Sequence, residues 1–227
     1  MTYNDIHEGI FLSRPNRFVA LVDIDGQTER CHVKNTGRCR ELLVPGTRVY
    51  VNHSENPNRA TRYDLVAVWK GTRLINMDSQ APNKVFYEYL QSGRYMAGLD
   101  FIRAEVRYGS SRFDFYMEAG PRKIFLEVKG VTLEEHGAAL FPDAPTLRGV
   151  RHLNELAACL RDGYEAHMVF VVQMDGIRYV APNNETHPAF GTALAAAHDA
   201  GVTVAALDCI VTPDSLRIGH PLPVKFG

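Results

Sequence analysis

Apolar and polar positions alternate along short segments of the first 80 residues, at the spacing of half-buried β-strands. Asp25-Gly26 and Gly71 each separate two such segments, as in hairpin turns. Closely spaced strands without a helix favour a small barrel of the oligonucleotide-binding kind or a compact sandwich, and the pattern does not decide between them. The predicted strands cover residues 18–24, 28–34, 47–52, 65–70 and 72–76.

The pattern changes at residues 83–96, where Val85, Phe86, Tyr89 and Leu90 recur at helical spacing. We therefore predict a first domain over residues 1–81 and a second over residues 82–227. In the second, helices are expected at 83–96, 146–163 and 188–200, and strands at 101–107, 112–118, 123–129, 167–174 and 202–211. The expected order is α-β-β-β-α-β-α-β, a mixed α/β arrangement.

Composition limits the class of protein. Of the 227 residues, 45% are hydrophobic, as in a fully folded chain. Neither a signal peptide nor an apolar run of the ~18 residues that span a membrane is recognisable, so we expect a cytoplasmic protein with no membrane partner. The net charge of -1 gives no overall support for nucleic-acid binding, although the first 84 residues carry a basic excess and the remainder an acidic one.

Charged residues interrupt the strands predicted at 112–118 and 123–129. Alternation places Glu127 and Lys129 on one face of the second strand. On the first strand, Asp114 is expected opposite a shared apolar face formed by Phe113, Phe115 and Met117. If the two strands pair as a hairpin, Asp114 approaches Glu127.

These groups have the chemistry of a metal-dependent phosphodiesterase. Asp114, Glu127 and the Val128 carbonyl offer the hard oxygen ligands that Mg²⁺ and Mn²⁺ prefer. Lys129 could orient an attacking water or stabilise the transition state, which makes Asp114, Glu127 and Lys129 the catalytic candidates. Considered alone, the tripeptide Glu127-Val128-Lys129 favours a solvated hairpin in which Asp114 pairs with Lys129, and it is the α-β-β-β-α-β order around it that favours the metal site.

Further candidates surround this set. Glu105 could complete the metal shell or belong to a surface ion pair. Arg148 and His152 share a polar helix face that could contact phosphate or water. A basic loop in the first domain is a candidate nucleic-acid groove, although an ordinary surface would look similar. Its candidate residues are Arg30, Lys34, Asn35, Thr36, Arg38 and Arg40.

Four segments together carry a resemblance to a known family. The chain resembles the sugar fermentation stimulation protein A family in VKNTGRCRELLVPG, EVRYGSSRFDF, LEVKGVTLEEHGAALFPDAPTLRGVRHLNEL and MVFVVQ. The resemblance implies an oligonucleotide-binding-like barrel followed by a restriction-endonuclease-like domain of the PD-(D/E)xK type. It places the nuclease signature on Asp114, Glu127 and Lys129, with Glu105 as an upstream acid. It also implies DNA binding without strong sequence preference and a link to the regulation of sugar metabolism, especially that of maltose.

Two hypotheses for function remain. In the first, the protein is a Mg²⁺- or Mn²⁺-dependent nuclease whose basic loop holds the DNA. In the second, it is a non-enzymatic DNA-binding transcriptional regulator that uses the nuclease fold as a scaffold. A small-molecule effector module in sugar control is a weaker alternative, because the sequence contains no recognisable sugar pocket. A homo-oligomer is compatible with each.

Overall fold

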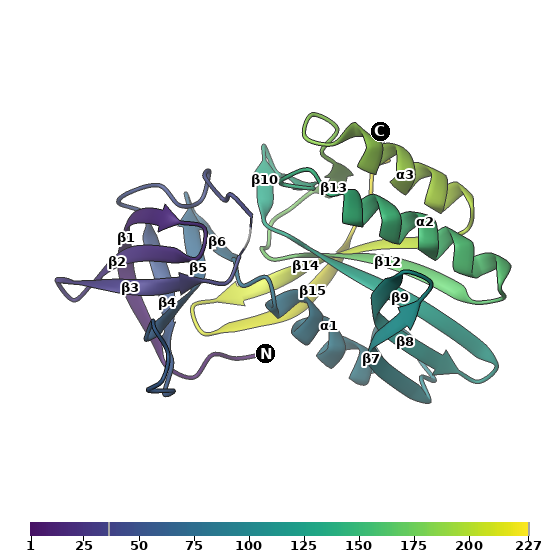
Figure 1. Ribbon diagram of the computed structural model, residues 1–227, viewed down its shortest axis with the longest axis horizontal. Coiled ribbons are helices and arrows are strands. Elements are labelled where there is room, and N and C mark those ends of the chain that lie inside the picture. Colours follow the sequence, from purple (N-terminus) through teal and green to yellow (C-terminus); the bar gives the residue numbers. More distant parts are fainter. Residues whose placement is uncertain (36, 227) are drawn as a thin grey trace.

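The computed structural model describes residues 1–35 and 37–226. Strands β1 to β5 form a closed barrel in the N-terminal part of the chain (Figure 1). They pair in the order β3-β2-β1-β4-β5, and parallel pairing of β3 with β5 closes the ring, while β6 extends β5. The strands are β1 (Ile6–Asn16), β2 (Val19–Ile24), β3 (Gln27–Val33), β4 (Arg48–His53), β5 (Tyr63–Lys70) and β6 (Arg73–Asn76). The structure confirms the barrel and excludes the sandwich.

The second part is built on a mixed sheet with the strand order β15-β14-β12-β9-β8-β7. β7, β8 and β9 are antiparallel neighbours, and β12 lies parallel to both β9 and β14. These strands are β7 (Phe101–Tyr108), β8 (Ser111–Ala119), β9 (Arg122–Val131), β12 (Glu165–Val172), β14 (Thr203–Thr212) and β15 (Ser215–Leu222). A small separate sheet contains β10 (Leu133–Glu135), β11 (Ala138–Phe141) and β13 (Tyr179–Pro182). The expected mixed sheet is therefore confirmed.

Helices cover both faces of this sheet (Figure 1). One face carries α1 (Ala81–Gln91), whose Phe86 packs with β8 and β9. The other carries α2 (Leu147–Arg161) and α3 (Pro188–Asp199). Thr146 caps α2, as expected, because its hydroxyl accepts a hydrogen bond of 3.0 Å from the Gly149 N–H. Among the described residues, no helix is long and apolar enough to cross a membrane.

The predicted common face of Phe113, Phe115 and Met117 is wrong. Phe113 packs beside α2, with its ring centroid 6.0 Å from that of His152, whereas Phe115 and Met117 belong to the cluster under α1. The β7–β8 pairing skips the level of Glu105 and Asp114, and Glu105 has a left-handed φ of +60°. At this irregularity the alternation of side chains along β8 changes phase. Phe113 and Phe115 therefore face opposite sides of the sheet, and Asp114 lies between them.

The barrel joins the sheet through several segments. The N-terminal segment pairs with β15, since the Leu216 N–H donates to Met1 O at 3.0 Å and the Tyr3 N–H donates to Asp214 O at 2.7 Å. At the end of β6, the Asn76 N–H donates to Gln173 O at 2.9 Å. Main-chain hydrogen bonds thus connect both ends of the barrel to the second domain.

Candidate active site and nucleic-acid interface

Asp114 lies where β8 separates from β9. The ladder between the two strands ends at the pair formed by Phe115 and Leu126. Beyond it, the Val128 N–H donates to Asp114 Oδ2 at 2.8 Å, and Asn83 Nδ2 on α1 donates to Asp114 Oδ1 at 2.7 Å. The N–H and C=O of one strand residue point toward the same edge, so the Val128 carbonyl also faces this opening.

Glu127 is the most buried acid of the site. The residue is only 3% exposed. Its Oε1 accepts hydrogen bonds from Lys129 Nζ at 2.6 Å and from His152 Nδ1 at 2.5 Å. Lys129 therefore pairs with Glu127 and not, as one alternative had it, with Asp114. Within the described residues, Glu127 Oε2 is buried without a hydrogen-bond partner. A buried carboxylate oxygen in that state costs free energy unless a ligand satisfies it.

The two carboxyl groups influence each other electrostatically. Burial, followed by the negative charge of Glu127, raises the pKa of Asp114 to about 6, and its hydrogen bonds offset only part of this effect. Burial also pushes the pKa of Glu127 upward, but the hydrogen bonds from His152 and Lys129 and the positive charge of Lys129 outweigh it and hold that pKa below its ordinary value. At neutral pH both carboxyl groups are thus mainly ionised, a combination that favours a bound cation.

His152 belongs to this cluster and not to the surface. It is 1% exposed, and its Nε2 accepts a hydrogen bond of 3.2 Å from Arg148 Nε. With Nε2 as the acceptor, Nδ1 carries the proton that is donated to Glu127. Arg148 itself is exposed above His152, whereas Glu155 turns to the β7–β8 hairpin and accepts a hydrogen bond from Ser110 Oγ at 2.5 Å.

Glu105 shares a pocket of about 260 Å³ with Asp114, but it does not join the carboxylate pair. Its carboxylate instead forms an exposed ion pair of 2.5 Å with Arg112 Nε. Among the described residues, no group of three or more His, Cys, Asp or Glu side chains is placed to hold a metal ion. The remaining pocket walls include Asn83, Lys84, Tyr87, Ala104 and Phe115.

A second pocket, of about 560 Å³, lies at the barrel and is here called the arginine pocket. The sequence predicted two of its cations, Arg38 and Arg40, but missed Arg14 and Arg17, which belong to β1 and the turn after it. The one sequence feature that could have indicated Arg14 and Arg17 is that the segment SRPNR contains two basic residues and no acidic one. Ala144, from the loop before α2, also lines this pocket, along with Asn16, Gly37 and Leu43.

Arg14 organises the loop beside this pocket. Its Nη1 donates to the carbonyl oxygens of Gly37 and Arg38 at 3.0 and 2.6 Å, and its Nη2 donates to those of Arg17 and Asn35 at 2.7 and 2.9 Å. The charge of Arg14 is consequently held at a fixed place beside the exposed side chains of Arg38 and Arg17.

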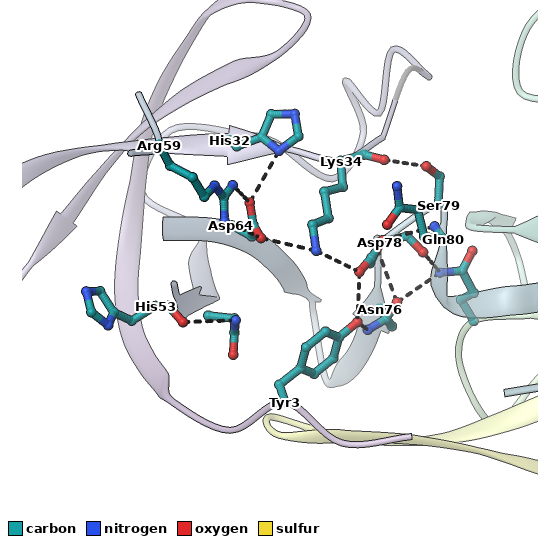
Figure 2. A network of polar contacts seen from close by, with 12 residues as sticks. Tyr3, His32, Lys34, His53, Arg59, Asp64, Asn76, Asp78, Ser79 and Gln80 are labelled. Atoms are coloured by element: carbon teal, nitrogen blue, oxygen red, sulfur yellow. Dashed lines mark hydrogen bonds and ion pairs between the residues drawn. The ribbon is translucent and has the colours of Figure 1, made fainter. Parts of the chain in front are cut away.

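Lys34 occupies a polar network between the domains (Figure 2). Its Nζ lies 3.1 Å from Asp64 Oδ2 and 3.5 Å from Asp78 Oδ2. Arg59 also binds Asp64 through both terminal nitrogens. Burial would raise the pKa of Asp64, but the hydrogen bonds from Arg59 and Lys34 hold it below its ordinary value. This network gives Lys34 two carboxylate partners within the protein.

The other predicted nucleic-acid residues lie in different surroundings. Arg30 is exposed on β3 and is not among the residues that line the arginine pocket. Asn35 is buried, and its Oδ1 accepts a hydrogen bond of 2.8 Å from the Gly37 N–H. Thr36 lies outside the described residues. The structure thus gathers Arg38 and Arg40 at one site, where Asn35 supports the adjoining loop, whereas Arg30 and Lys34 are not among the residues that line this pocket.

Family models match both parts of this architecture. The model of the SfsA N-terminal OB domain matches residues 12–77, and that of the sugar fermentation stimulation protein RE domain matches residues 80–215. The chain belongs to the sugar fermentation stimulation protein family. Each of these family models places its domain on one of the two folded parts described above.

Relatives in this family match along the whole chain. A sugar fermentation stimulation protein homolog of Desulfitobacterium hafniense strain Y51 is 60% identical over 226 residues, covering 100% of this chain and 99% of that protein. The homolog of Ruminiclostridium cellulolyticum is 54% identical and covers 100% of both chains. A solved structure described as Pyrococcus furiosus SfsA in complex with Ca²⁺ is 31% identical, has a TM-score of 0.90, and covers 99% of this chain and 98% of that one.

Proposed function

We propose that this protein is a divalent-metal-dependent phosphodiesterase that binds and cleaves DNA. The observation that carries the proposal is the buried Glu127 Oε2, which lacks a hydrogen-bond partner in the described residues and belongs to a carboxylate coupled to that of Asp114. An ordinary structural ion pair would satisfy both oxygens of so deeply buried an acid. A cation-binding site explains why one oxygen is left free.

The donor set fits Mg²⁺ or Mn²⁺. Asp114, Glu127 and the Val128 carbonyl would hold the ion, and waters and substrate oxygens would complete its shell, since Mg²⁺ is usually bound by one or two carboxylates. Glu105 would have to leave Arg112 to take part. When bound, such an ion lowers the pKa of water and neutralises charge on phosphate. The Ca²⁺ complex of the Pyrococcus furiosus relative supports a divalent site in this fold.

Protein side chains would supply the remaining functions. Lys129, with its side chain 14% exposed, can present N–H donors to a water or a phosphoryl oxygen while it stays paired with Glu127. His152 donates to the same oxygen, Glu127 Oε1, with its Nδ1 3.5 Å from Lys129 Nζ, so both donors occupy Oε1 and Oε2 is left for a ligand. Arg148 donates a hydrogen bond to His152 through Nε. The two terminal nitrogens of the Arg148 guanidinium are then available for a DNA phosphate.

Cleavage of labelled DNA in the presence of Mg²⁺ or Mn²⁺ tests this proposal. We expect wild-type protein to cut and Lys129→Met to lose activity by about 100-fold, because a donor to the transition state is removed. Glu127→Gln should be similarly inactive. Glu165→Gln is the matched control, since it neutralises an acid in a surface ion pair with Arg122. Equal cleavage by wild type and Glu127→Gln would refute the assignment.

One observation favours the non-enzymatic alternative. Glu127 already accepts hydrogen bonds from Lys129 and His152, so its charge is partly balanced without a metal ion. In that case the protein would be a DNA-binding regulator, which the family resemblance ties to maltose metabolism. Binding would then depend on salt, survive EDTA and be unchanged in Asp114→Asn, and wild-type protein would leave DNA intact.

A further inference from the structure

We propose that the arginine pocket binds single-stranded DNA, with phosphates held by arginines and one unpaired base stacked beside Phe18. The proposal rests on the proposed function, because it assumes a DNA partner, and it adds the strand state of that partner. It places binding at a part of the barrel that the sequence indicated only through Arg38 and Arg40.

The charge of the pocket selects an anion. Of the described residues that line it, Arg14, Arg17, Arg38 and Arg40 are basic and none is acidic. The last three are exposed and can adjust to a ligand. Guanidinium groups bind phosphate oxygens through paired N–H donors, so several arginines around one hollow suit consecutive phosphates.

The pocket is also held in shape before a ligand arrives. Arg14 binds the loop carbonyls described above, and its Nε is buried without a hydrogen-bond partner among the described residues. Asn16 Oδ1 accepts a hydrogen bond of 2.9 Å from the Phe18 N–H and so fixes the turn that presents Arg17. Because this main chain is already ordered, binding requires little additional loss of conformational entropy.

An exposed aromatic ring accompanies these charges. Phe18 is 50% exposed, and the Arg17 guanidinium lies 5.1 Å from its ring centroid. A large apolar side chain that is half exposed at a tight turn contributes little to the stability of the free protein. Beside a row of phosphate-binding groups, however, it offers a surface on which an unpaired base can stack, as proteins that bind single strands commonly do.

The shape of the site favours a single strand over a duplex. A hollow of about 560 Å³ admits a small part of a flexible strand. In a duplex the bases are stacked on each other and paired, so neither face of a base is free for Phe18. A duplex could therefore reach the arginines only with its backbone and would lose the stacking contact.

The pocket adjoins the second domain on the side that leads to α2. A Cβ atom at Gly37 would lie 2.1 Å from Asp143 Oδ2, so this loop of the barrel is packed against the segment before α2. Ala144 of the same segment lines the pocket, and α2 then carries Arg148 and His152. A strand that leaves the pocket over Ala144 would therefore pass toward the carboxylate site.

Fluorescence anisotropy with labelled oligonucleotides of about 12 nucleotides, in EDTA to prevent cleavage, tests the proposal. We expect wild-type protein to bind single-stranded DNA at least about tenfold more tightly than a duplex of the same length. Phe18→Ala should weaken single-strand binding about tenfold and leave duplex binding unchanged. Arg38→Ala should weaken binding of both, whereas Arg30→Ala, which removes an exposed arginine that does not line the pocket, should bind like wild type.

An abasic strand with the same phosphates separates stacking from charge without any protein variant. We expect the wild type to bind it more weakly than the normal strand, and Phe18→Ala to bind both strands equally well. A duplex bound as tightly as the single strand, or a Phe18→Ala effect that persists on the abasic strand, would overturn the inference while leaving the nuclease proposal intact. Absence of binding to every DNA would defeat both.

Discussion

The Val128 N–H donates a hydrogen bond of 2.8 Å to Asp114 Oδ2, across the point where β8 stops pairing with β9. A side-chain carboxylate thus takes the position that a main-chain acceptor would occupy in a continuous ladder. The exchange keeps the N–H satisfied and brings a second acid beside Glu127. The sheet gives up regular pairing here, and the resulting opening holds the candidate chemistry.

Replacing Asp114 by Asn should stabilise the protein. The folded-state pKa of about 6 exceeds the ordinary value of 3.8, so the ionised carboxylate destabilises the fold at any pH above about 6, and this penalty shrinks as the pH falls toward 4. We expect Asp114→Asn to gain about 1–2 kcal/mol at pH 7.5, with the gain vanishing near pH 4. Urea denaturation at both pH values measures it.

Glu127→Gln provides the opposite case. Because the pKa of Glu127 is held below its ordinary value, its ionised form stabilises the fold, and that contribution is lost as the pH falls through the folded pKa. The Gln variant should therefore be less stable than wild type at pH 7.5. The electrostatic account of the site would be wrong if both variants shifted stability in the same direction.

Divalent cations should raise the thermal stability of wild-type protein. A ligand that binds the native state stabilises it by mass action, and saturating Mn²⁺ should raise the Tm by on the order of 5 °C. Asp114→Asn and Glu127→Gln should lose this response, while Glu165→Gln should keep it. Differential scanning fluorimetry, with and without excess EDTA, provides the measurement. A full response in Glu127→Gln would place the ion elsewhere.

His167 should make stability depend on pH. Burial lowers its pKa from 6.5 to about 4, and its Nδ1 is 2.7 Å from the Tyr95 hydroxyl. Between these pH values the unfolded chain binds a proton that the native state does not, so stability falls as the pH is lowered. Wild type should lose about 2 kcal/mol through this group between pH 7.5 and pH 5.

Substitution isolates that contribution. His167→Gln should lose about 2 kcal/mol less stability than wild type over the same pH interval, whereas His220→Gln, at a side chain 80% exposed, should behave like wild type. Chemical denaturation of the three proteins at each pH provides the comparison. Parallel losses in all three would show that another group carries the dependence.

Gly130→Ala should destabilise the protein through a steric conflict. An added Cβ would lie 2.6 Å from Pro82 Cγ and 2.7 Å from Gln173 Oε1, so α1 would have to move away from β9. We expect a loss of about 1–3 kcal/mol in urea denaturation. Pro82→Ala in the same chain should recover part of it, whereas strictly additive effects would contradict a direct clash.

The sequence predicted most of the second sheet because its strands keep regular spacing and its helices have clear apolar stripes. It missed β1 and β15, where Pro15, Gly219 and Pro221 interrupt the pattern and where the pairings contain register shifts. Such interruptions favour a turn when each segment is considered alone. Pairing with neighbouring strands overrides that local preference.

The candidate site was predictable to the extent that it is local. Glu127 and Lys129 are two residues apart on one strand, and the hairpin brings in Asp114. The contribution of Asn83 was not predictable, because it comes from a residue 31 positions away from Asp114. Nor does a polar helix stripe reveal that His152 is buried against a carboxylate, since that depends on which strand the helix covers.

The pairing of the N-terminal segment with β15 has a consequence for how DNA would be handled. Main-chain hydrogen bonds hold the barrel at both of its ends. It therefore cannot pivot in the way that a domain attached by a single flexible linker can. The path from Arg38 to Asp114 then has a constant length set by the protein. If both proposals hold, cleavage would fall at a fixed number of nucleotides from the phosphate held in the barrel, and the fragments would have a uniform length.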